Sequence, residues 1–92
     1  MQDLAVIIVN YRTPDLTLQC VASLLPARAR FPGLRAIVVD GGSADDSAGR
    51  IAAGVAARGW DDWATVLPLD VNGGFAFANN RAIAALAAAG PL

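Results

Sequence analysis

Short apolar runs alternate along the chain with stretches in which apolar residues recur at helical spacing. The runs are rich in β-branched residues and predict three strands, at residues 4–9, 35–40 and 65–69. The helical stretches predict helices at residues 13–26, 43–58 (or 44–58) and 75–89. Short loops join these elements, which favours an α/β fold with a three-stranded parallel sheet, helical crossovers and spatial strand order 3-2-1.

Capping residues refine the limits of these helices. Thr13 and Pro14 suit the cap and first position of the first helix, which we expect to end near Pro26. Ser43 suits the cap of the second helix, since the acidic residues that follow favour a positive first turn. We expect residues 27–34 to form a connection. Cys20 falls in the apolar pattern of the first helix, which predicts a small buried core residue.

Composition narrows the possible functions. The 92 residues are 55% hydrophobic and carry a net charge of −1, which indicates one domain at most and no basic surface for nucleic acid. The absence of histidine excludes a Ser-His-Asp triad and removes the commonest metal ligand. The single cysteine cannot form an internal disulfide. Together with the absence of a signal peptide or a transmembrane run, it predicts a cytoplasmic protein, with the inner face of the membrane as an alternative.

A polar segment follows each predicted strand, at residues 10–12, 40–43 and 72–74, and the second and third of these segments contain glycines. The carboxyl ends of parallel strands meet at one edge of a sheet, where open α/β folds bind ligands. Tyr11 offers a ring face to a base, and Asp40 can accept hydrogen bonds from a base or a ribose. Capped loops without a ligand are the alternative. Asn79 and Asn80, both poor helix formers, predict either a ligand contact or a hydrogen bond from helix to loop.

Three motifs carry a resemblance to a known family: VIIVNY at residues 6–11, VVDGGSADDS at 38–47 and NGGFAFANN at 72–80. In order and spacing they resemble the inverting family 2 glycosyltransferases, most closely the rhamnosyltransferase-like branch. The resemblance implies a GT-A, Rossmann-like half-domain. Residues 1–92 would then be the N-terminal nucleotide-sugar-binding part of a glycosyltransferase domain, in truncated form. The complete enzyme would transfer a sugar from a nucleotide-diphosphate sugar to an acceptor, in cell wall or polysaccharide biosynthesis.

The same resemblance implies a nucleotide site for a donor of the UDP or dTDP type. Its residues would be Asn10, Tyr11, Asp40, Gly42, Gly74 and Asn80. Tyr11 would line the base pocket and Asp40 would contact the nucleobase. The chain departs from the family pattern at Gly41 and Arg12, both of which stand where asparagine is common.

Catalytic and metal-binding residues are not expected within these residues. The family's Asp-x-Asp motif, which holds Mg or Mn, and its catalytic base come later in the chain, whereas this sequence has no Asp or Glu after Asp70. We therefore expect no sugar transfer by these residues alone. A non-catalytic α/β scaffold or interaction domain of the same fold is the alternative. The first strand would lack a neighbour on one side, which predicts self-association through an exposed sheet edge.

Overall fold

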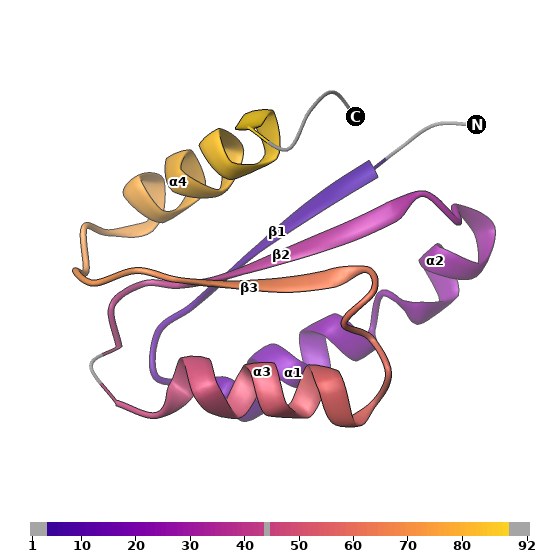
Figure 1. Cartoon of the computed structure of the whole chain (residues 1–92), viewed down its shortest axis with the longest axis horizontal. Coiled ribbons are helices and arrows are strands. Elements are labelled where there is room, and N and C mark those ends of the chain that lie inside the picture. The colour runs from indigo at the N-terminus through magenta and orange to yellow at the C-terminus, as the bar shows by residue number, and fades with distance from the viewer. Residues whose placement is uncertain (1–3, 44, 89–92) are drawn as a thin grey trace.

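A computed structural model describes residues 4–43 and 45–88 as three strands and four helices (Figure 1). The elements are β1 (Leu4–Asn10), α1 (Pro14–Ala22), α2 (Leu25–Arg30), β2 (Leu34–Asp40), α3 (Ser47–Ala57), β3 (Ala64–Pro68) and α4 (Phe75–Ala88). The strands form one parallel sheet in the order β1-β2-β3. The α/β class, the parallel sheet and the predicted strand order are confirmed.

Helices cover both faces of the sheet: α1 and α3 lie on one side and α4 on the other (Figure 1). Successive side chains of a strand point to opposite faces, so β2 supplies both cores. Val38 packs with Ile51 and Val55 of α3, while Ile37 and Val39 pack with small residues of α4. This double burial explains the uninterrupted apolar run at residues 36–39 of β2.

The region after α1 differs from the prediction. A helix reaching Pro26 and a connection over residues 27–34 were both wrong, because α1 ends at Ala22 and α2 begins at Leu25. Pro26 lies in the first turn of α2. Proline is tolerated there because the first-turn N–H groups have no partner within the helix. The proline therefore belongs to the start of a helix instead of to its end.

Two further predictions were wrong. Cys20 is exposed, because the buried side of α1 is formed by Pro14, Thr17 and Val21. The helix after β2 begins at Ser47, with Asp46 in the cap position, so Ser43 is no helix cap. The other limits differ by one residue: β2 includes Leu34 and β3 runs from Ala64 to Pro68. The last residue predicted for the final helix, Ala89, lies outside the described residues.

Strand β1 lies at an edge, since within the described sheet it pairs with β2 alone. Its residues from Ala5 to Val9 are each partly exposed. None of the helices in residues 4–43 and 45–88 has the length and hydropathy needed to span a bilayer.

Candidate functional site

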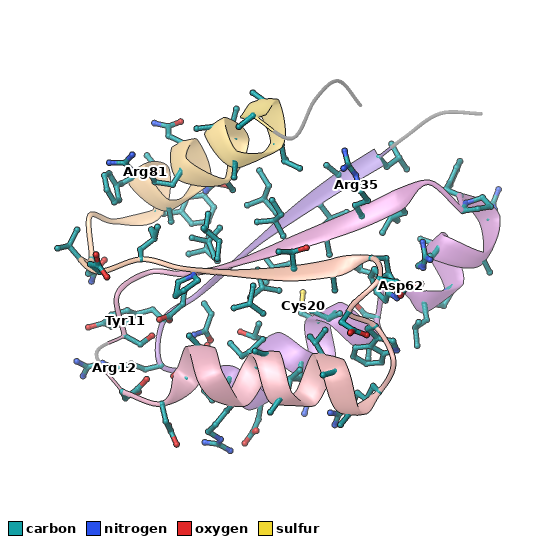
Figure 2. The ribbon with its side chains drawn as sticks, in the orientation of Figure 1. Tyr11, Arg12, Cys20, Arg35, Asp62 and Arg81 are labelled. Carbon is teal, nitrogen blue, oxygen red and sulfur yellow. The ribbon has the colours of Figure 1, made fainter. Side chains whose placement is uncertain are left out.

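The loops that follow β1, β2 and β3 meet at the carboxyl edge of the sheet, as their sequence predicts. Asn10 and Asp40 are register partners at the ends of β1 and β2. The backbone N–H of Gly41 donates to the carbonyl of Asn10 at 2.8 Å, and that of Leu69 donates to the carbonyl of Asp40 at 3.0 Å. Figure 2 shows Tyr11 and Arg12 at this edge.

Asn10 is fully buried, at 0% exposed, and its side chain orients Asp40. Its Oδ1 accepts from the Thr17 hydroxyl at 2.8 Å and from the backbone N–H of Thr13 at 3.2 Å. Because an N–H group can only donate, these bonds identify the amide oxygen. The amide nitrogen of Asn10 therefore faces Asp40 and donates to its Oδ1 at 3.0 Å. Asn10 acts at this site through Asp40.

Ser43 orients Asp40 from the other side. The buried Ser43 hydroxyl accepts a hydrogen bond from the backbone N–H of Arg12 at 2.9 Å, so its own proton is directed to Oδ1 of Asp40. Two donors thus occupy one carboxylate oxygen. Among the described residues no hydrogen bond reaches the other oxygen, Oδ2. Asp40, only 5% exposed, is therefore held as an acceptor with one oxygen left for a ligand.

Tyr11 and Arg12 form the exposed side of the edge. The Tyr11 side chain is 42% exposed, and the Arg12 guanidinium carbon lies 5.0 Å from the centre of its ring. Arg12 has a φ of 60°. This left-handed conformation costs a residue with a side chain roughly 1–2 kcal/mol, and asparagine adopts it more readily.

Asp45 adds a negative charge beside Arg12. The side chain and the backbone N–H of Ser47 hold the pKa of Asp45 below its usual value, and the positive charge of Arg12 acts in the same direction. Asp45 is therefore ionised at neutral pH, so the exposed side of the edge carries both signs of charge.

Gly42 brings the second and third loops into backbone contact. Its φ is 76°, and a Cβ placed on it would lie 2.4 Å from the carbonyl carbon of Val71 and 2.6 Å from the backbone nitrogen of Asn72. Gly74 also has a positive φ, 91°, but open space surrounds it. Gly42 is required by space and conformation together, whereas Gly74 is required by conformation alone.

The two asparagines of α4 differ. The Asn79 amide donates to the carbonyl of Phe75 at 2.9 Å, which is a contact within the helix. The sequence had predicted a ligand contact or a hydrogen bond from helix to loop for this residue. Asn80 is exposed, and no hydrogen bond among the described residues joins its side chain to Asp40 or Tyr11. The structure therefore connects Asn10 and Asp40 directly, and leaves Asn80 outside their hydrogen-bond network.

Thr17 is a member of this network that the sequence did not reveal. It is 4% exposed and donates to Asn10 from the first helix. The available signal was a β-branched polar residue between Leu16 and Leu18, on a helix position next to the apolar pattern. A hydroxyl at such a position needs a partner when it is buried.

The family resemblance implies a divalent metal for the complete enzyme. The side chains that the structure describes do not provide a set of ligands for such a metal. Within residues 4–43 and 45–88, no group of three His, Cys, Asp or Glu residues lies together in a way that could hold a metal ion.

Comparison with known proteins identifies the family. No curated protein and no solved structure matches the chain. The family model for glycosyl transferase family 2 matches residues 5–89, a range that contains all three loops of the carboxyl edge. The parallel α/β sheet agrees with the Rossmann-like half-domain of the GT-A fold. The chain therefore belongs to glycosyl transferase family 2.

Proposed function

We propose that the carboxyl edge of the sheet binds the nucleotide of a nucleotide-diphosphate sugar, and that the chain is the donor-binding part of a glycosyltransferase. The observation that carries the proposal is Asp40, whose Oδ1 is occupied by Asn10 and Ser43 while Oδ2 is left for a ligand. The exposed ring of Tyr11 supplies a stacking surface near it. Family membership supports a nucleotide-sugar donor in general.

The chemistry of Asp40 favours a uracil or thymine base, hence a donor of the UDP or dTDP type. Both bases carry an N–H group at ring position 3, and a carboxylate oxygen can only accept. Cytosine presents an unprotonated nitrogen at the same position, which leaves two acceptors facing each other. A site built to pair with a donor rejects an analogue that lacks it, because the buried acceptor is then left without a partner.

Substitution of Asp40 tests this proposal. We expect Asp40→Ala to weaken UDP binding by about 1.5–3 kcal/mol, the worth of a hydrogen bond to a charged group. Asp40→Asn is the sharper variant, because its amide oxygen can accept from Asn10 and Ser43 while its NH₂ group faces the ligand. Calorimetric titration should show that the wild type prefers UDP to CDP and that Asp40→Asn reverses or abolishes this preference.

Asp46→Ala is the matched control, since it removes an equal charge at an exposed position and its side chain makes no capping hydrogen bond. Its affinity for UDP should equal that of the wild type. Equal binding of UDP and CDP by the wild type would contradict the base assignment. No binding of either nucleotide would favour the non-catalytic scaffold or interaction domain instead.

The remaining assignments are proposals that rest on the motifs. The VIIVNY, VVDGGSADDS and NGGFAFANN motifs support the rhamnosyltransferase-like branch and a role in cell wall or polysaccharide biosynthesis. The single cysteine supports a cytoplasmic location. A divalent metal, Mg or Mn, is proposed for the complete enzyme only. No catalytic residue is assigned among the described residues.

We also propose self-association through the free edge of β1. This edge runs from Leu4 to Asn10 without a charged residue or a proline, the usual protection of an edge strand. We expect sedimentation velocity to show a concentration-dependent increase in mass. Leu4→Lys places a charge at the exposed start of β1 and should reduce this increase. A wild-type monomer at every concentration would contradict the proposal.

A further inference from the structure

Arg12 holds an unusual conformation for its residue type. Among the described residues it is the one non-glycine residue with a positive φ. Asparagine, which the family resemblance expects here, would adopt this conformation at lower cost. A strained residue at a ligand-binding edge is a reason to ask what its side chain does there.

Ser43 holds both the backbone and the side chain of Arg12. The backbone N–H of Arg12 donates to the Ser43 hydroxyl, a contact that any residue except proline could make. Its side-chain Nε donates to the Ser43 carbonyl at 3.1 Å, a contact that needs the arginine. The Nε end of the guanidinium is thereby fixed beside the loop that carries Asp40.

The outer part of the guanidinium remains available. In the described part of the chain, its two Nη atoms make neither a hydrogen bond nor an ion pair. Arg28 and Arg50, in contrast, form ion pairs with Asp62 and Asp15. The Arg12 guanidinium lies over the ring of Tyr11, and its positive charge is one of the influences that lower the pKa of Asp45.

We propose that Arg12 binds the phosphate groups of the donor nucleotide. This inference rests on the proposed function, which places the base at Tyr11 and Asp40. The phosphates are the charged part of that ligand, and a planar guanidinium with two free nitrogens suits bidentate contact with phosphate oxygens. Ser43 bonds to both Asp40 and Arg12, so a single buried residue sets the base contact and the phosphate contact relative to each other.

The test is a titration of uridine, UMP and UDP into the wild type, Arg12→Gln and Arg12→Lys. We expect Arg12→Gln to weaken UDP binding about tenfold or more, the loss of one charged contact, and to leave uridine binding unchanged. The UDP affinity of Arg12→Lys should lie between those of the wild type and Arg12→Gln, because lysine keeps the charge but lacks the planar fork. Arg50→Gln removes the same charge on the surface between α1 and α3 and should change none of the affinities.

The outcomes separate this inference from the proposed function. If uridine binds and Asp40→Ala weakens it, but Arg12→Gln leaves the ratio of UDP to uridine affinity unchanged, the Arg12 assignment alone is overturned. If Arg12→Gln binds all three ligands more weakly by the same factor, the Arg12 assignment is also overturned, and Arg12 is a positioning residue for Tyr11. If Arg12→Gln binds all three ligands more tightly by the same factor, the assignment is overturned as well, because the guanidinium would then be covering the Tyr11 ring. If the wild type binds neither uridine nor UDP, both proposals are overturned.

Discussion

Gly42→Ala is expected to destabilise the protein by about 2–5 kcal/mol and to abolish nucleotide binding. The positive φ contributes roughly 1–2 kcal/mol of this for a residue with a side chain. Overpacking of the added methyl group contributes about 1–3 kcal/mol more. The atoms it would meet belong to the backbone of Val71 and Asn72, which cannot rotate away as a side chain could. Urea denaturation followed by circular dichroism measures the loss of stability.

Gly41→Ala is the matched control, one residue earlier in the same loop. A Cβ at Gly41 would lie 3.5 Å from the carbonyl oxygen of Asn10, an ordinary contact, and Gly41 has no positive φ. We expect no loss of stability and a gain of up to about 1 kcal/mol, because alanine restricts the unfolded chain. Equal stability of the Gly41 and Gly42 variants would show that the two loops do not need their close contact.

Asn10→Asp is expected to cost about 3–5 kcal/mol at pH 7, although the two side chains have nearly the same shape. The amide of Asn10 donates to Asp40, and an aspartate would place a second carboxylate against the first in a buried position. The unfolding free energy of a small domain is about 5–15 kcal/mol, so this variant approaches the limit of folding. Chemical denaturation at a series of pH values measures the effect.

The destabilisation by Asn10→Asp should decrease as the pH falls from 7 toward about 4. The folded variant gains by binding a proton between the two carboxyl groups, whereas the unfolded chain has no such pair. The folded state therefore binds more protons, and its stability falls as the pH rises. Gln19→Glu makes the same charge change at an exposed position of α1 and should shift stability by no more than about 0.5 kcal/mol. A pH-independent loss would mean that Asn10 acts by packing alone.

Local pattern in the sequence was sufficient for the architecture. The β-branched runs and the helical spacing that follows them identify three strands and the helices α1, α3 and α4, because these periodicities record which faces of each element are buried. They did not identify α2, whose described residues include none that is buried. The parallel sheet in turn implies that the loops after residues 10, 40 and 68 share one edge. The motifs on these loops also identified glycosyl transferase family 2, which the family match confirms.

Tertiary structure decided how the polar residues are used. From the sequence alone, Asn10 and Ser43 could have faced a ligand or capped a helix, since a polar side chain is satisfied equally by any partner of the right kind. Their partner is Asp40, 30 residues from Asn10 along the chain, so only the folded sheet reveals it. The side chain of Cys20 is exposed for a similar reason, since the sequence did not decide which side of α1 faces the sheet. The rotation of a helix about its axis is set by the surface it packs on, and the apolar pattern of α1 was compatible with more than one rotation.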